Sequence, residues 1–586
     1  MSVAQIIAEQ KPSQSSPGVG RFLGQALALL KVLRVSRERH YIFALSVGIA
    51  LVVLLTALGQ VWLNTWQGNF YDALARRDLA MFGAELGIFG AIVAFLVVLG
   101  VLQAWFRELL KIRLREGLTR DLLAQWLRPR SAYRLTMLGD IGVNPDQRLQ
   151  EDARHLTELT ADLGIGLLQA TVLLFSFVGV LWELSDRVTL PIEGRLVHVP
   201  GYMVWCALAY AAFGSMLTWF VGRPRIRYNA EHYAREAALR FSLVRVSEAA
   251  ESIALDGAEE AELRQLGTVF ERVLEIMRTL ANNMASLTWV QSSYGYIALV
   301  VPIVVASPGY FEGTLTFGAL IMVAGAFTQV QQSLRWAVDN FPSIADWSAT
   351  FLRVMTFYEA LVSVNRLDRD APHINVFEHP EDDLEFEELC VVMSDGTATL
   401  VEGNVRIGAG ERVQIIGTAG TGKALLFRAL AGLWTSGSGT LGLPPRDRMM
   451  FMPQRPYLPP GPLREVLSYP LPPDTYPRDA VAAALARVGV DRLIKDLEHT
   501  ENWDRDLTLA EQQNLAIVRV LLHRPRWLVM NEALDTLDDA GRNNLLGILT
   551  RELHETAVVS IDTAVLTGPF FTRTLHVKKL PLSEAA

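Results

Sequence analysis

Closely spaced glycines ahead of a lysine form the one segment whose residue types point directly to a chemistry. An apolar run at 413–416 predicts a buried strand, and helical periodicity from Leu425 to Leu433 predicts a helix. Between these two elements lie Gly417, Gly420, Gly422 and Lys423. Glycines let several backbone N–H groups point at one anion, the start of the helix adds its positive dipole end, and the lysine supplies charge for the outer phosphates. The segment predicts a loop that binds the phosphates of a nucleotide.

The residue after the lysine departs from this pattern. A phosphate-binding loop that works with magnesium carries serine or threonine there, because the hydroxyl holds the metal ion that bridges the terminal phosphates. In this chain the position is Ala424. The site is therefore predicted to hold phosphate and to hold Mg²⁺ weakly or not at all.

The composition indicates a membrane part followed by a soluble part. The chain has 586 residues, of which 51% are hydrophobic and 20% charged, and the apolar residues are concentrated ahead of the phosphate-binding segment. A chain of this length is expected to form several domains. The net charge of −8 argues against nucleic acid as the main partner. Cys206 and Cys390 fall in different predicted domains, so neither a disulfide nor a thiolate metal site is expected.

Six apolar runs are long enough to cross a membrane. They lie at about 41–63, 83–105, 163–184, 202–221, 294–307 with its flanks, and 316–334. Basic residues precede the first run, and the long segments 107–162 and 223–288 are charged and rich in arginine, which places them in the cytoplasm. Both long segments have helical patterns, so the spanning helices are expected to continue past the bilayer. Six spans put both termini on the cytoplasmic side.

Six spans followed by a phosphate-binding domain resemble an ABC half-transporter. Several motifs narrow this resemblance to the SbmA/BacA-like group of bacterial inner-membrane transporters, in particular to members that carry their own ATPase domain. The motifs are Asn144 to Asp152, Glu236 to Glu262, Gln329 to Asn340, and Pro453 to Tyr457. The resemblance implies a multi-pass protein of the bacterial inner membrane, active as a homodimer, that moves peptides or bulky hydrophilic compounds such as cobalamin.

The predicted fold is an α-helical transmembrane domain of six spans with cytoplasmic helix extensions, followed by an α/β nucleotide-binding domain of ABC type. The expected divisions are a flexible tail at 1–30, the transmembrane domain at 31–365, a linker at 366–383 and the nucleotide-binding domain at 384–586.

The resemblance also assigns the remaining ATPase motifs, and several of them are altered. Gln454 matches the glutamine of the Q-loop, and Glu532 matches the catalytic base. Thr508 and Ala510 lie in the signature segment, where Ala510 replaces a glycine that approaches the nucleotide held by the other subunit. Asn531 replaces the aspartate associated with the metal, and Asp562 stands where a histidine is expected.

These departures affect one mechanism. The losses at Ala424 and Asn531 weaken magnesium binding, and an acid at Asp562 would repel the outermost phosphate of ATP. Phosphoryl transfer depends on positioning and charge neutralisation, so each loss is expected to cost a few kcal/mol, at a tenfold rate loss for each ~1.4 kcal/mol. The hypothesis is that ATP hydrolysis is very slow or absent. The sequence leaves two alternatives for the loop: it still binds a nucleotide, or it is a structural turn that remained after function was lost.

Four ionisable residues near the apolar runs are candidates for transport, because a charge inside a membrane is costly. They are Glu85, Glu183, Arg335 and Asp339, the last two spaced to pair on one helix face. The alternative is that these groups only extend to the interface or pair at helix ends. A set of glutamines could line a wet cavity or bond between helices: Gln60, Gln103, Gln169, Gln291, Gln329 and Gln332.

The sequence thus predicts a dimeric inner-membrane transporter with a degenerate ATPase domain. Its energy could come from ATP binding, or from the proton gradient acting through carboxylates such as Glu85. A non-transporting membrane scaffold is the alternative of another class, and pairing with a competent partner chain is a further possibility. The sequence does not define the substrate or the direction of transport.

Overall fold

The computed structural model describes residues 39–137, 145–186, 188, 190–192, 195–197, 199–363, 373–393, 396–537, 539–566 and 568–581. The chain divides into two compact units, and each is described by itself. One is a helical unit that ends at Glu359, and the other holds the chain from Ala360 onward together with the short segment that begins at Leu127. The predicted tail at 1–30 lies outside the described residues.

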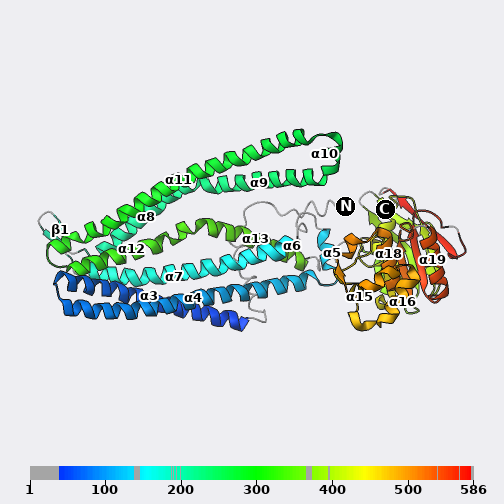
Figure 1. Ribbon diagram of the computed structural model, residues 1–586, viewed down its shortest axis with the longest axis horizontal. Helices are drawn as coiled ribbons and strands as arrows, with labels where there is room; N and C mark the ends of the chain where they lie inside the picture. Colours follow the sequence, from blue (N-terminus) through cyan, green and yellow to red (C-terminus); the bar gives the residue numbers. More distant parts are fainter. Residues whose placement is uncertain are drawn as a thin grey trace. The chain divides into compact units, whose positions relative to one another are not determined.

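The helical unit is built from long helices that run side by side (Figure 1). A pair of short strands, β1 (Leu190–Ile192) and β2 (Arg195–Val197), joins α7 to α8. The helices are α3 (Arg39–Ala75), α4 (Leu79–Trp126), α6 (Pro145–Gln147), a π-helical turn η2 (Arg148–Asp152), α7 (Ala153–Ser185), α8 (Tyr202–Gly222), α9 (Pro224–Glu248), α10 (Ala250–Asp256), α11 (Glu259–Phe311), α12 (Phe317–Asp339) and α13 (Phe341–Ser363).

Among the described residues, five helical segments are long and apolar enough to cross a membrane: 39–75, 79–126, 145–185, 202–248 and 259–311. They contain the first five predicted spans. The sixth prediction, 316–334, coincides with α12, whose glutamines at 329, 331 and 332 make it less apolar than the other five. With 23 residues, α12 is still about 34 Å long, enough for the hydrocarbon core.

The expectation that helices continue past the bilayer is confirmed by their lengths. The 53 residues of α11 extend over about 80 Å, more than twice the thickness of the hydrocarbon core. The arginine-rich segment after α8 continues as α9, which packs along α11. A rigid helical arm therefore extends from this part of the unit, visible in Figure 1 as the pair α9 and α11 joined through α10.

Small residues allow α3 and α12 to approach closely. A methyl group added at Gly318 would lie 2.0 Å from the carbonyl oxygen of Gly68, so both helices need glycine at this crossing. Asp72 accepts a hydrogen bond of 2.7 Å from the backbone N–H of Gly318. These contacts fix α12 in the centre of the bundle, where it also packs against α7, α8 and α11.

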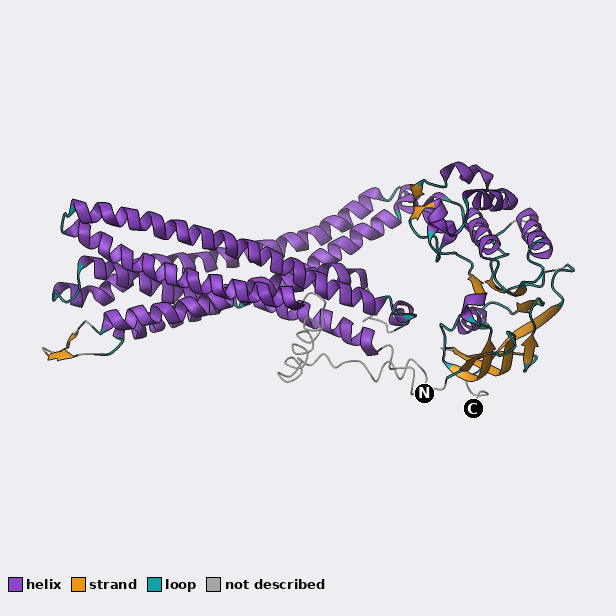
Figure 2. Ribbon diagram, turned by 90° about the horizontal axis from the view of Figure 1, so that it is seen from below, coloured by secondary structure: helices purple, strands orange, loops and turns teal. Residues whose placement is uncertain are grey.

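The second unit is an α/β domain, and Figure 2 shows the sheet in it, while the helical unit carries the short pair β1 and β2. Its main sheet has the strand order β3-β8-β4-β5-β14-β7-β13-β12-β9, with β6 paired to β4. The strands from β14 to β9 are parallel, and the pairs among β8, β4, β5 and β14 are antiparallel. The strand bounds are β3 (Asn375–Glu378), β4 (Leu384–Met393), β5 (Gly396–Leu400), β6 (Val405–Ile407), β7 (Arg412–Ile416), β8 (Gly437–Leu443), β9 (Met449–Met452), β12 (Trp527–Asn531), β13 (Ala557–Asp562) and β14 (Arg573–Leu580).

Helices cover this sheet, and an apolar core lies among them. The core joins Val466, Leu485, Leu515 and Leu549, all buried, to the strand residue Leu528. Trp503 is buried in it, as expected for a core residue, and its indole N–H donates to the carbonyl of Gly461. The helices are α14 (Lys423–Leu430), α15 (Leu463–Ser468), α16 (Arg478–Val488), α17 (Trp503–Asp506), α18 (Leu509–His523) and α19 (Asp539–Arg551); short strands β10 (Gly461–Pro462) and β11 (Thr500–Glu501) pair beside them.

The sheet begins earlier in the chain than the predicted boundary at 384. The strand β3 lies inside the segment 366–383 that was expected to be a linker, and it pairs in parallel with β8. The acidic and proline content of that segment concealed a strand of four residues. The helix α5 (Ser131–Thr136), which follows α4, also groups with this α/β unit.

Candidate functional site

The phosphate-binding loop lies at the carboxyl ends of neighbouring parallel strands. Ile416 ends β7, Asp562 ends β13 beside it, and Asn531 ends β12 on the next position. Ligands of open α/β sheets bind at this edge. Gly420 and Gly422 have φ of +81° and +94°, which residues with a side chain rarely adopt. The sequence prediction of strand, glycine loop and helix is confirmed at this position.

Gly417 and Gly422 are required for space as well. A methyl group added at Gly422 would lie 2.5 Å from the Cβ of Ala398, and one at Gly417 would lie 2.6 Å from the Oγ1 of Thr421. Lys423 is the first residue of α14, so the N–H groups of the first turn of this helix face the loop. The loop, the start of the helix and the lysine therefore fit the phosphates of a nucleotide.

Lys423 is held by groups of its own domain. Its ammonium is 6% exposed, forms an ion pair of 3.2 Å with the Oε1 of Glu532, and donates to the Oγ1 of Thr563 at 2.7 Å and to the carbonyl of Asp562 at 3.1 Å. Thr563 in turn donates to the Oε1 of Glu532. A phosphate that approaches this lysine must displace or share these oxygen atoms.

The residues at the expected magnesium position offer few ligand atoms. Magnesium prefers six oxygen ligands with carboxylate charge among them. Ala424 supplies no ligand atom, and Asn531 supplies one neutral amide oxygen, buried and without a hydrogen-bond partner among the described residues. Glu532 is the nearest acid on this strand end, and it is paired with Lys423.

Asp562 is a buried acid beside the lysine. The residue is 0% exposed, and its Oδ2 accepts a hydrogen bond of 3.0 Å from the side-chain amide of Gln414. Burial raises the pKa of Asp562 above its usual value, although the hydrogen bond from Gln414 opposes this shift. Gln414 also binds the backbone at Ala564 and Leu566, so it fixes the end of β13.

No described hydrogen bond joins the other predicted nucleotide residues to this cluster. Gln454 is exposed, and its carbonyl accepts from the side chain of Gln513. Thr508 caps the start of α18, and Ala510 follows in the first turn of that helix. Among the described residues, neither Thr508 nor Ala510 has a hydrogen bond to the phosphate-binding loop. Their expected contact with a nucleotide on another subunit stays a prediction.

The helical unit contains a cavity of about 510 Å³ lined mainly by α3, α11 and α12. Its polar lining consists of amide and hydroxyl side chains from α3 and α12: Gln60, Asn64, Gln67, Thr328 and Gln329. No charged side chain lines it among the described residues. Gln60 and Gln329 thus line a cavity, which is the first of the two roles considered for the glutamines.

Gln103 and Gln169 take the second role. The amide of Gln103 on α4 donates to the carbonyl oxygen of Gln169 on α7 at 3.0 Å. Hydrogen bonds between polar side chains hold helices together where neighbouring surfaces are apolar. This pair is therefore a structural bridge rather than a part of the cavity.

The four transport candidates have different environments. Glu85 is 7% exposed, and its Oε2 is buried without a hydrogen-bond partner among the described residues. Glu183 is exposed near the end of α7. Arg335 and Asp339 form the predicted pair on one face of α12, with 3.1 Å between Nη2 and Oδ1. The guanidinium of Arg335 also lies over the ring of Tyr294.

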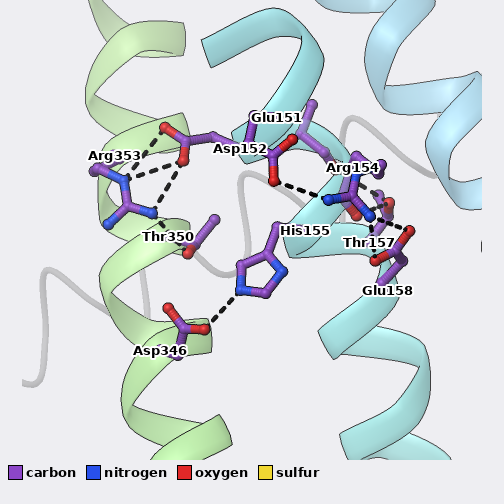
Figure 3. A network of polar contacts seen from close by, with 10 residues as sticks. Glu151, Asp152, Arg154, His155, Thr157, Glu158, Asp346, Thr350 and Arg353 are labelled. Atoms are coloured by element: carbon purple, nitrogen blue, oxygen red, sulfur yellow. Dashed lines mark hydrogen bonds and ion pairs between the residues drawn. The ribbon is translucent and has the colours of Figure 1, made fainter. Parts of the chain in front are cut away.

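A charged network joins the start of α7 to α13 (Figure 3). Asp152 is 4% exposed and pairs with Arg148 at 2.6 Å and with Arg353 of α13 at 3.0 Å. One turn further along, His155 contacts Asp346 at 2.6 Å. The motif 144–152 noted in the sequence is thus anchored to the helix that ends the unit, although Asn144 lies outside the described residues.

A helical membrane unit and an α/β unit with a nucleotide loop, fused in one chain, define an ABC half-transporter. Residues 29–311 match the family model described as ABC transporter transmembrane region 2, and residues 400–535 match the model described as ABC transporter. The chain belongs to the ABC transporter family.

Several relatives align with most of the chain. An uncharacterized ABC transporter ATP-binding protein of Synechocystis is 30% identical over 90% of this chain and 79% of its own length. The inner membrane ABC transporter ATP-binding protein YddA of Escherichia coli is 27% identical, with 88% and 91% covered. The lysosomal cobalamin transporter ABCD4 of Homo sapiens is 24% identical, with 91% and 92% covered.

Sequence reasoning missed several residues of these sites. Thr563 and Gln414 hold Lys423 and Asp562, and Asn64 and Gln67 line the cavity. A polar glutamine within the apolar strand 412–416 was a signal available in the sequence, because a buried amide requires partners. Thr563 carried no comparable signal.

Proposed function

We propose that this chain is one half of a dimeric transporter of the inner membrane, in which ATP binds and is hydrolysed very slowly or not at all. The observation that carries the proposal is the state of Lys423. Its ammonium is neutralised by Glu532, while Ala424 and Asn531 leave the metal position without a hydroxyl and without a carboxylate. A site of this kind binds phosphate through the lysine and backbone N–H groups and lacks the metal on which rapid phosphoryl transfer depends.

The proposed substrates are peptides or similarly bulky hydrophilic compounds, including molecules of the cobalamin type. Two features support this class. The cavity in the helical unit offers amide and hydroxyl groups without charge, which suit ligands rich in amides. One relative is named as a cobalamin transporter. The narrower SbmA/BacA-like grouping rests on the motifs of the sequence and is part of the proposal.

The proposal also includes location in the inner membrane and assembly of two copies of the chain. The relative YddA is named as an inner-membrane protein, which supports the same location here. In this proposal both termini lie in the cytoplasm, which the basic segments and the six spans expected from the sequence support. A second copy of the chain would supply the signature segment with Thr508 and Ala510 to each nucleotide.

A proton-driven version of transport is the second candidate. It is favoured by Glu85, a buried carboxylate in an apolar helix whose Oε2 lacks a partner among the described residues. Carboxylates inside membrane segments are typical of proton pathways in transporters. In this version the ATPase domain would be a relic.

One uptake experiment separates the two versions from a scaffold that transports nothing. Cells that express the chain are given a toxic peptide or labelled cobalamin, and accumulation is compared with that of the Lys423→Ala and Glu85→Gln variants. Loss of uptake with Lys423→Ala alone supports nucleotide gating. Loss with Glu85→Gln and with a proton uncoupler supports the second version, and no uptake above that of empty cells contradicts transport of these compounds.

A further inference from the structure

A second cavity with positively charged walls lies in the α/β unit, away from the phosphate-binding loop. It has a volume of about 420 Å³ and lies between α5, the end of α14 and strand β3. Three arginines line it, Arg130, Arg134 and Arg446, against one carboxylate, that of Glu378. Arginines thus outnumber carboxylates among the described residues that line the cavity, and the transport proposal makes no use of it.

Arg130 is fixed in the wall of this cavity. A methyl group added at Gly432 would lie 2.5 Å from the Nη2 of Arg130, so the guanidinium lies directly on the backbone there. Gly432 has a φ of +66° and follows the last turn of α14. The carbonyl groups at a helix end attract a cation. This contact orients Arg130 and docks α5, but a backbone dipole neutralises only part of its charge.

Arg446 is held by an aromatic ring. Its guanidinium lies over the ring of Phe451, with 4.2 Å from Cζ to the ring centroid. Such stacking uses the flat face and leaves the N–H edge able to bind an anion. Desolvation lowers the pKa of Arg446, and the positive charge of Arg130 lowers it further. The residue keeps contact with solvent, so a small anion can reach it.

His373 adds an unpaired polar group. Both ring nitrogens are buried, and neither has a hydrogen-bond partner among the described residues. Buried nitrogens without partners are rare, because each costs the free energy of a lost hydrogen bond. Because water does not reach either nitrogen, His373 lines the cavity through the rest of its ring and is not counted among the binding groups.

We propose that this cavity binds a small anion that carries phosphate groups, held by Arg130 and Arg446, with Arg134 beside them. Arginine binds phosphate oxygens in pairs of hydrogen bonds, and several arginines at one place are typical of such sites. The bound anion would neutralise the repulsion between Arg130 and Arg446. It would also tie α5 to the nucleotide-binding unit. This inference does not depend on whether ATP is hydrolysed.

The test is calorimetric titration of pyrophosphate into the full-length protein in nanodiscs of phosphatidylcholine. The Lys423→Ala background removes the main charge of the phosphate-binding loop, so the remaining binding reports the second cavity. We expect pyrophosphate still to bind in that background. A further Arg446→Gln change is expected to raise Kd about tenfold or more, the loss of one charge-assisted contact. Arg446→Lys, which keeps the charge, is expected to restore part of the affinity.

Two controls keep the test specific. Arg551→Gln, at an exposed position on α19, should leave Kd unchanged. Pyrophosphate should also slow hydrogen exchange at 131–136, because the anion ties α5 down. If phosphatidylglycerol in the nanodiscs competes with pyrophosphate, the natural ligand is a lipid headgroup. If it does not compete, the natural ligand is a soluble compound. Loss of all binding with Lys423→Ala, or a Kd unaffected by Arg446→Gln, would overturn the proposal.

Discussion

The pairing of Lys423 with Glu532 is the residue-scale feature from which most of the function follows. In an active ATPase of this type the lysine binds the phosphates and the glutamate orients the attacking water. Here the two side chains are 3.2 Å apart and neutralise one another. The lysine is buried, so its charge needs this partner when no nucleotide is bound. Glu532 therefore competes with phosphate for Lys423.

Replacement of this acid gives the first prediction. Glu532→Gln removes the competing charge, so ATP should bind about threefold to tenfold more tightly, equivalent to ~1 kcal/mol. The gain should appear without magnesium, as measured by calorimetric titration. Glu498→Gln, at an exposed position, is the matched control. Weaker binding in Glu532→Gln would show that the carboxylate helps to hold the nucleotide.

A second prediction concerns the missing metal ligands. The double variant Ala424→Ser with Asn531→Asp returns a hydroxyl and a carboxylate to the strand ends. Because magnesium would then bridge protein and phosphates, ATP affinity should become magnesium-dependent by about tenfold or more. In each single variant, the effect of magnesium on ATP affinity should be smaller. Equal affinities with and without magnesium in the double variant would mean that the backbone, rather than these side chains, excludes the ion.

At the scale of elements, the first turn of α18 depends on a reciprocal capping box. Thr508 accepts from the backbone N–H of Glu511, and Glu511 accepts from the backbone N–H of Thr508. The guanidinium of Arg492 lowers the pKa of Glu511, and the hydrogen bonds from Thr508 add to this shift. The charged form thus stabilises the folded state.

The pH dependence of this turn is the third prediction. Because the pKa is lower in the folded state, the stabilisation is fully present above the unfolded pKa of about 4.5 and is lost as the pH falls through the folded value. Hydrogen exchange in the first turn of α18 should therefore be faster in Glu511→Gln than in the unmodified protein at pH 7. Near pH 3 the two should converge. A constant ratio at all pH values would contradict the role of the charge.

The network between α7 and α13 gives the fourth prediction. Asp152→Asn leaves Arg148 and Arg353 without their shared carboxylate, and we expect a loss of about 2 kcal/mol of stability. Glu158→Gln removes a more exposed pair with Arg154 and should cost much less stability. Thermal unfolding in detergent compares the two. Equal midpoints would mean that the contacts in Figure 3 do not hold α13.

At the scale of the whole molecule, local patterns predicted the elements and long-range contacts were missed. The spacing of glycines and Lys423 predicted the nucleotide loop, because every part lies within a few residues. Apolar run lengths predicted the spanning helices for the same reason. The pair of Asp152 with Arg353 joins positions 201 apart in the sequence, and no local pattern carries that information. The approach of α5 to the end of α14 is equally non-local.

The strand β3 shows a different limit. Its four residues lie in an acidic stretch with proline, and all four are at least partly exposed, so no apolar alternation marks them. Pairing with β8 alone makes them a strand. The family followed from sequence because membrane runs and nucleotide loop occur in one chain. The substrate did not, because a cavity of amides such as Gln60 and Gln329 forms only when α3 and α12 meet.

The most direct test of the account is equilibrium binding of ATP to the purified, detergent-solubilised protein, with and without magnesium, beside Lys423→Ala. We predict binding that requires Lys423 and changes by less than about twofold with magnesium, together with hydrolysis far below one turnover per second. Binding strengthened by magnesium about tenfold or more, with several turnovers per second that Glu532→Gln abolishes, would contradict the account. The chain would then be an active ATPase despite Ala424 and Asn531.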